Sequence, residues 1–169
     1  MPECLISFGS NVDDRLGNIQ QAMSEMTVFF RFKKISSLYE TQPVGYPHQG
    51  WFLNLVAQGE FNEDPLELMR LILEIQGKYR GEKKFKNAPR SIDVDILTFE
   101  NVIITTKELT LPHPEMDKRL FVLLPLQEIC PDFIHPECRL KIDELIQNCP
   151  DKSEVKLIGD LTKKLGEDI

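Results

Sequence analysis

The segment NAPRSIDVDIL, residues 87–97, is the stretch that decides the fold and chemistry expected of this chain. Its second half alternates acidic and apolar residues, and a period of two is typical of a β-strand. Asp93 and Asp95 should therefore project from one face of the strand, while the apolar residues beside them pack on the other. Two carboxylates about 7 Å apart, at roughly 3.3 Å of rise per residue, suit hard cations such as magnesium.

A cationic segment leads into this strand. Residues 78–90 contain six Lys or Arg against one Glu, in a chain whose formal net charge is −7. A solvated basic turn is the ordinary interpretation of such a segment, and a solvated strand face is the ordinary interpretation of two aspartates. Two carboxylates on one face repel, however, which favours a bound cation. Metal-binding carboxylates beside phosphate-binding cations indicate a nucleotide site, although the chain has no P-loop motif.

Length and composition predict one domain spanning residues 1–169. We expect a core at about 1–105, a C-terminal extension at about 106–160 and a frayed tail at about 161–169. The chain is 41% hydrophobic and 28% charged, which is typical of a globular protein. It has no apolar run long enough for a membrane span and no secretory pattern at its start. We therefore expect a cytoplasmic protein with no membrane partner.

The four cysteines and the acidic balance exclude two other classes. No Cys-x-x-Cys pair is present, so reduced thiols are expected rather than a zinc site. The negative net charge argues against a nucleic-acid partner, which would require a basic face. Small-molecule partners and a monomer are the expectation.

Periodicity and turn residues predict the order β-α-β-β-α-β over the first two-thirds of the chain. Strands are expected at 4–8, 30–39, 52–61 and 91–99. One helix should follow Asp13 or Asp14, and another should begin after Asp64 with Pro65 in its first turn. This order predicts an α+β, ferredoxin-like core, in which an antiparallel sheet carries helices on one face and leaves the other face free.

Shorter elements are expected around and beyond this core. Residues 102–104 should return as a short partner of the 91–99 strand. The C-terminal extension should contain a helix at 117–130 that breaks at Pro125 and a second helix around 142–146. Residues 155–158 should form a late edge strand.

Five motifs in order carry a resemblance to a known family. They are FGSN at 8–11, YETQPVG at 39–45, FLN at 52–54, PRSIDVDIL at 89–97, and LPHP at 111–114 followed by Arg119 and Phe121. In this order and spacing they resemble the 6-hydroxymethyl-7,8-dihydropterin pyrophosphokinase family of folate biosynthesis. The resemblance implies an enzyme that moves pyrophosphate from MgATP to the hydroxymethyl oxygen of a reduced pterin and releases AMP.

The resemblance also implies the residues that hold the metal and ATP. Asp93 and Asp95 match positions that hold two magnesium ions, and these aspartates with Arg90 and Arg119 are the expected catalytic residues. The family's Gly-Arg-x-Arg is Gly-Lys-Tyr-Arg here, at 77–80. The expected ATP-binding residues are Glu74, Lys78, Arg80, Lys86, Asn87, Arg90, Ile96, Thr110, His113, Pro114 and Arg119.

A pterin is flat, aromatic and edged with hydrogen-bonding groups, so its site requires aromatic faces and amide partners. Without the resemblance, Phe52 and Phe121 would be interpreted as ordinary core residues. With it, they are expected to stack on the two ring faces. The expected substrate-binding residues are Thr41, Pro43, Val44, Phe52, Asn54, Asp93, Asp95 and Phe121.

Two other function classes remain open from the residues alone. A ferredoxin-like domain can also be a non-catalytic ligand- or RNA-binding module, because this fold supports many roles. An RNA-binding version would display aromatic residues where this chain has carboxylates. An ordinary kinase that releases ADP is the third possibility, although neither the P-loop nor the protein-kinase motifs occur.

Overall fold

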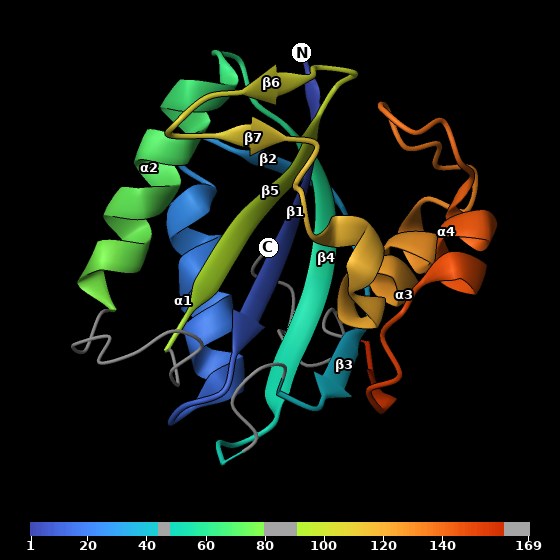
Figure 1. Ribbon diagram of the computed structural model, residues 1–169. Coiled ribbons are helices and arrows are strands. Elements are labelled where there is room, and N and C mark those ends of the chain that lie inside the picture. Colours follow the sequence, from blue (N-terminus) through green and yellow to red (C-terminus); the bar gives the residue numbers. More distant parts are fainter. Residues whose placement is uncertain (44–47, 80–90, 161–169) are drawn as a thin grey trace.

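The computed structural model describes residues 1–43, 48–79 and 91–160 (Figure 1). One antiparallel sheet contains β1 (Glu3–Ser10), β2 (Arg31–Ile35), β3 (Leu38–Thr41), β4 (Phe52–Glu60), β5 (Asp93–Phe99) and β8 (Val155–Gly159). A second, two-stranded sheet pairs β6 (Ile104–Thr105) with β7 (Thr110–Leu111). The helices are α1 (Arg15–Met26), α2 (Pro65–Lys78), the 3₁₀ helix η1 (Met116–Lys118), α3 (Leu120–Ile129) and α4 (Ile142–Asn148).

The strand order in the main sheet is β5-β1-β4-β3-β8, and β2 also pairs with β4. The interior strand β1 is buried over almost its whole length, because it pairs with β4 and β5 and helices pack on the sheet. The expected helix starts are confirmed. Asp14 accepts a hydrogen bond from Gly17 N at 3.0 Å, and Asp64 accepts one from Glu67 N at 3.0 Å.

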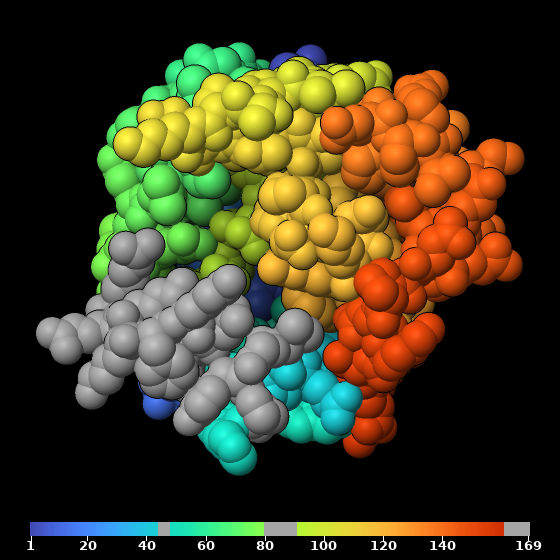
Figure 2. Space-filling view, viewed as in Figure 1, coloured from blue at the N-terminus to red at the C-terminus, as the bar shows by residue number. Residues whose placement is uncertain are grey.

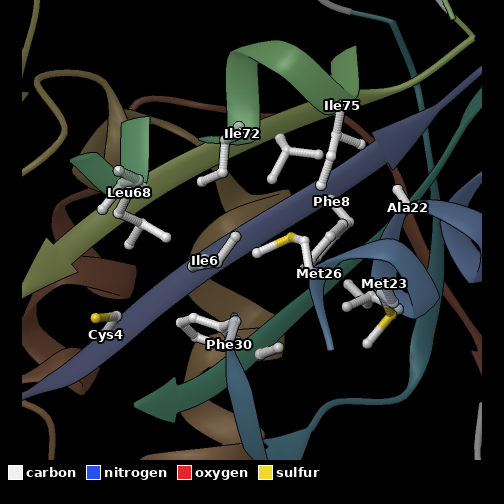
Figure 3. Close-up of a cluster of buried hydrophobic side chains, with 14 of the residues drawn as sticks. Cys4, Ile6, Phe8, Ala22, Met23, Met26, Phe30, Leu68, Ile72 and Ile75 are labelled. Carbon is white, nitrogen blue, oxygen red and sulfur yellow. The ribbon is translucent and has the colours of Figure 1, made fainter. Parts of the chain in front are cut away.

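The main hydrophobic core lies between one face of the sheet and helices α1 and α2 (Figure 3). Alternate residues of β1 supply its centre, and the core also contains Met23 and Met26 of α1 and Leu68 and Ile72 of α2. Fully burying one such side chain contributes roughly 1.5–3 kcal/mol. Met23 and Met26 are therefore core residues of the protein.

The expectation that the opposite face of the sheet is free is wrong, because α3 covers part of it and α4 packs against α3. A second cluster packs Leu5, Val56 and Leu97 of the sheet against Leu123 and Leu126 of α3. The strongly apolar composition of α3 is the feature of the sequence that indicates this packing. The part of the face that α3 leaves open carries the polar residues described below.

The predicted single strand at 30–39 is wrong, because Ser36 and Ser37 divide it into β2 and β3. Ser36 is fully buried, and its hydroxyl accepts a hydrogen bond from Val56 N at 3.0 Å and donates one to Ser37 O at 2.8 Å. A side chain that bonds to backbone groups in this way replaces ladder hydrogen bonds and allows the edge of the sheet to bend.

Two further expectations about short elements are wrong. Residues 102–104 do not return along β5; Ile104 belongs to β6, which pairs with β7. The helix does not break at Pro125, and it begins at Leu120 after a separate 3₁₀ turn. The helical bond that Pro125 cannot make is the bond to the Phe121 carbonyl, close to the start of the helix, so the cost is confined to its first turns.

The remaining elements of the extension follow the prediction. Helix α4 covers the predicted 142–146 segment, and β8 forms an edge strand beside β3. The tail at 161–169 lies outside the described residues. Over the described ranges, every helix is too short or too polar to cross a bilayer.

Candidate active site

A hollow of about 210 Å³ opens on the part of the sheet that α3 does not cover. Figure 2 shows atoms of β5 and β1 at the bottom of this depression, beside α3. Its lining combines carboxylates, cations, amides and aromatic rings: Ser7, Phe8, Gly9, Thr41, Gln42, Phe52, Asn54, Asp93, Asp95, His113, Arg119 and Phe121. Most of these residues were predicted as site residues from the sequence.

Sheet register places the polar residues in rows across the floor of this hollow. Gly9 on β1 lies opposite Asp93 on one side and Asn54 on the other, and Ser7 lies opposite Asp95. A Cβ atom on Gly9 would lie 2.7 Å from Asn54 Oδ1, so a larger residue would displace the amide. The floor therefore combines two carboxylates with an amide on one face.

Among the strands that the structure describes, β5 is at the edge of the sheet, and its outward backbone groups have no strand partner there. Val94, between the two aspartates, donates its backbone N–H to Gln76 Oε1 of α2 at 2.7 Å. This bond satisfies a backbone donor that the sheet cannot, and it holds the aspartate-bearing strand against α2.

His113 stands between the aspartates and Arg119. Its Nδ1 atom accepts a hydrogen bond from Glu115 N at 3.1 Å, which leaves the proton of the neutral ring on Nε2. The Nε2 atom lies 3.9 Å from Asp95 Oδ1. Burial lowers the pKa of His113, and Arg119 lowers it further, against the opposing effects of Glu115 and Asp93. The ring is therefore a neutral N–H donor at neutral pH, suited to an anionic oxygen.

The other end of the hollow is aromatic and amide-rich. Phe52 begins β4, and Phe121 lies in the first turn of α3. The guanidinium of Arg119 lies 5.7 Å from the centroid of the Phe121 ring. Asn54 donates its side-chain amide to Thr41 Oγ1 at 2.6 Å, which fixes the orientation of a buried amide in the wall. These groups fit a flat, hydrogen-bonding ring.

A second hollow of about 210 Å³ adjoins the first, with which it shares Asp95 and His113. It is lined by residues of α2, β5 and the segment around β7: Met69, Asp95, Ile96, Thr106, Lys107, Glu108, Leu109, Thr110, His113 and Pro114. Four of these lining residues, Ile96, Thr110, His113 and Pro114, were predicted to bind ATP. Two neighbouring hollows that meet at a carboxylate and a histidine can hold two substrates with their reacting ends together.

Some predicted residues do not line these hollows. Glu74 pairs with Arg70 on the exposed side of α2, and Lys78 pairs with Glu25 at 3.3 Å. Pro43 is described but lines neither hollow. Val44, Arg80, Lys86, Asn87 and Arg90 lie outside the described residues.

Sequence reasoning assigned no role to several residues that line the site, among them Ser7, Gln42 and Met69. Ser7 had a detectable signal, since it is a polar residue at a β1 position that shares the face of Gly9. Gln42 lay within a recognised motif without a role. The position of Met69 depends on how α2 packs, which its sequence does not show.

The carboxylates fit magnesium held together with a nucleotide. Within 1–43, 48–79 and 91–160, no three or more His, Cys, Asp or Glu side chains form a group that could hold a metal ion. Magnesium, however, commonly binds through one or two carboxylates and completes its shell with water and substrate phosphates. Asp93 and Asp95, on one strand face beside a second hollow, supply such a pair.

Two adjoining hollows and a carboxylate pair suited to magnesium indicate that the protein belongs to the class of nucleotide-dependent transferases. The family model described as 7,8-dihydro-6-hydroxymethylpterin-pyrophosphokinase (HPPK) matches residues 5–131, and the chain belongs to this family. A protein of Aquifex aeolicus named 2-amino-4-hydroxy-6-hydroxymethyldihydropteridine pyrophosphokinase is 38% identical over 144 residues, covering 85% of this chain and 90% of that protein. A Bacillus subtilis protein of the same name is 40% identical over 127 residues, covering 74% and 76%.

Solved structures agree on the fold. Wild-type HPPK-DHPS of Plasmodium falciparum matches with a TM-score of 0.68 at 15% identity, over 86% of this chain. This chain spans 44% of that longer one, so the similarity concerns one part of it. The mixed architecture of helices on an antiparallel sheet is therefore shared with HPPK-containing proteins.

Proposed function

We propose that this protein transfers pyrophosphate from MgATP to the hydroxymethyl oxygen of 6-hydroxymethyl-7,8-dihydropterin and releases AMP, as a step of folate biosynthesis. In this reaction the hydroxymethyl oxygen forms a bond to the β-phosphorus of ATP, and the bond from that phosphorus to the α-phosphate oxygen breaks. AMP leaves with this oxygen and its electron pair, and the hydroxyl proton passes to water. Family membership and the names of relatives support this activity over a non-catalytic binding module.

One observation carries the proposal: the two hollows meet at Asp95 and His113, and Asp93 lies in the first of them. ATP in the hollow beside β7 would extend its phosphates toward the aspartates. A pterin between Phe52 and Phe121 would present its hydroxymethyl group to the same place. Holding both substrates in reacting geometry converts a bimolecular step into an effectively unimolecular one.

Each residue is assigned the contact that its side chain suits chemically. Asp93 and Asp95 would hold magnesium, which supplies positive charge to the phosphates and lowers the pKa of the attacking hydroxyl. The Arg119 guanidinium and the neutral His113 Nε2–H donate to phosphate oxygens, where negative charge develops during transfer. Phe52 and Phe121 hold the pterin ring, and Asn54, oriented by Thr41, bonds to its edge. Val44, Arg80, Lys86, Asn87 and Arg90 are proposed to complete the phosphate and pterin contacts, with Glu74, Lys78 and Pro43 nearby.

Finer features belong to the same proposal. Two magnesium ions would be held by Asp93 and Asp95 together with the triphosphate. The core is ferredoxin-like, which the order β5-β1-β4 followed by β2 and β3 supports, with β8 as an addition at the edge. The protein works as a cytoplasmic monomer on small molecules, without a nucleic-acid or membrane partner.

The nucleotide product tests the proposal most simply. The protein is incubated with MgATP, with and without 6-hydroxymethyl-7,8-dihydropterin, and AMP and ADP are separated by chromatography. We expect AMP that forms only with the pterin, in a 1:1 ratio with pterin pyrophosphate. ADP would identify an ordinary kinase, and the absence of turnover with measurable ligand binding would identify a binding module.

A further inference from the structure

A short C-terminal segment, residues 151–155, contacts both sides of the hollow that we assign to the pterin. One side is the start of α3, with Arg119 and Phe121. The other is the end of β3, with Thr41 and Gln42. The family match ends at residue 131, so this segment lies beyond the matched region.

Asp151 binds the first residue of α3 from outside the helix. Its Oδ2 atom accepts a hydrogen bond from Leu120 N at 3.0 Å, and its Oδ1 atom accepts one from Ser153 N at 2.8 Å. Arg119 occupies the N-cap position of α3, but its side chain makes no capping hydrogen bond to the described residues. Asp151 therefore supplies the cap, and a carboxylate at this end is favoured by the helix dipole.

The charge of Asp151 agrees with this role. Burial opposes ionisation of the carboxyl, but hydrogen bonds from Ser153 and from Leu120 N outweigh it and hold its pKa below the usual range. The cap is consequently ionised at neutral pH. An ionised cap forms stronger hydrogen bonds than a neutral one.

Glu154, three residues after Asp151, bonds to the opposite wall of the hollow. Glu154 donates its backbone N–H to Gln42 Oε1 at 2.8 Å, and Gln42 donates its own N–H to Glu154 O at 3.2 Å. Val155 then begins β8 and pairs with Thr41, the residue that orients Asn54. Residues 151–155 thus connect two walls that come from distant parts of the chain.

We propose that residues 151–155 brace the pterin site and that Asp151 is a positioning residue, which sets the place of Arg119 and Phe121 without touching substrate. This inference rests on the proposed function for the identity of the ligand. The second hollow contains no residue of α3 or β8 among those that line it in the described ranges. Loss of the brace should therefore affect the pterin and leave the nucleoside unaffected.

The test compares Asp151→Ala and Asp151→Asn with Asp143→Ala. Asp143 is a matched control, because it accepts a hydrogen bond from Gln127 near the far end of α3 at 2.7 Å. We expect Asp151→Ala to raise the KM for the pterin through Phe121 and to lower kcat through Arg119, each by at most roughly 2- to 30-fold, the range that corresponds to loss of a helix cap. Asp151→Asn keeps one acceptor and should be intermediate. Affinity for AMP should change less than about twofold in all three variants.

Hydrogen exchange gives a readout that does not depend on activity. The amides of residues 120–123 should exchange faster in Asp151→Ala than in the parent, while Asp143→Ala leaves them unchanged. Parent-like pterin KM and parent-like exchange in Asp151→Ala would overturn the brace. If Asp151→Ala does not fold, the pterin KM and the exchange rates of Asp151→Asn alone test the brace, because Asn retains the shape of the side chain. A parent that forms no AMP would refute the proposed function, whereas the exchange result would still test the brace.

Discussion

Gln76, in the last turn of α2, accepts a hydrogen bond at 2.7 Å from the backbone N–H of Val94, the residue between Asp93 and Asp95. The bond joins the proposed metal-binding strand to the helix that leads into the cationic segment at residues 78–90. Movement at the end of α2 would therefore be transmitted to the aspartates.

Gln76→Ala should lower the apparent affinity for magnesium more than it lowers the free energy of unfolding. Losing one hydrogen bond of this kind costs about 0.5–1.5 kcal/mol, and the freed edge strand holds its carboxylates less firmly. We expect the magnesium concentration for half-maximal AMP release to rise several-fold. Gln76→Glu keeps an acceptor and should lie closer to the parent. Gln58→Ala, which removes a 3.3 Å hydrogen bond to Glu3 elsewhere in the sheet, serves as control. An unchanged magnesium titration in Gln76→Ala would contradict the link.

Thr41→Val should raise the KM for the pterin. The change keeps the shape of the side chain but removes the acceptor of the 2.6 Å bond from Asn54. An unsatisfied buried amide costs about 1–3 kcal/mol, so Asn54 would rotate away from its present orientation. Thr41→Ser retains the hydroxyl and is the matched control. Steady-state kinetics at saturating ATP would show the effect, and equal KM values for the Val and Ser variants would refute the role given to Thr41.

Arg119→Ala and Phe121→Ala should separate turnover from pterin binding. Removing a donor to the charge that develops in the transition state lowers kcat by about 10²- to 10³-fold. Removing one aromatic face should instead act mainly on pterin affinity, which fluorescence titration measures. If Arg119→Ala loses pterin affinity as strongly as turnover, its assignment to the phosphates is wrong.

Stability should fall as pH decreases below about 6.5, partly through His135, which lines neither hollow. Its Nδ1 atom accepts hydrogen bonds from Glu137 N and Cys138 N, both at 3.2 Å. Burial lowers its pKa, against the opposing effects of Asp117 and Glu137, so the folded state favours the neutral ring. The stabilisation is complete above the unfolded-state pKa and is lost as pH falls toward the folded-state pKa.

Urea unfolding at pH 7.5 and 5.5 measures this effect. His135→Asn cannot titrate but keeps an acceptor for the backbone, so the difference in unfolding free energy between the two pH values should be smaller than in the parent. His113 has a lowered pKa as well, so part of the difference should remain. An identical difference in both proteins would exclude His135 as a contributor.

The sequence predicted those parts of the fold and site that depend on local patterns. The alternation around Asp93 and Asp95 predicted β5, and the cap residues Asp14 and Asp64 predicted both core helices. The division of the 30–39 strand could not be predicted, because it depends on a hydrogen bond from Val56 N to Ser36 Oγ, and Val56 is distant in the sequence. Side-chain links between distant segments have no periodic signature in the sequence.

The same distinction applies to the site. Motif residues such as Phe52, Asn54 and His113, which the sequence singled out, line the first hollow together. Gln76 and Asp151 act through backbone groups of other elements, and nothing in their local sequence indicates this. Their roles follow from the way α2 and the C-terminal segment pack.

The central claim is that Asp93 and Asp95 hold the magnesium that couples ATP to the pterin, and one paired measurement tests it directly. Asp93→Asn and Asp95→Asn each replace a hard anionic ligand with a neutral amide of the same shape. Each variant is titrated with magnesium while AMP release is followed, and its thermal melting is measured without ligand. Asp143→Asn, on α4, serves as control.

We expect each active-site variant to lose most activity and to require at least about tenfold more magnesium, because a neutral oxygen binds the ion more weakly. Melting without ligand should stay at the parent temperature or rise, since repulsion between neighbouring carboxylates is relieved. A variant that melts well below the parent while keeping the parent's magnesium response would contradict the account, because the aspartates would then stabilise the fold rather than bind metal.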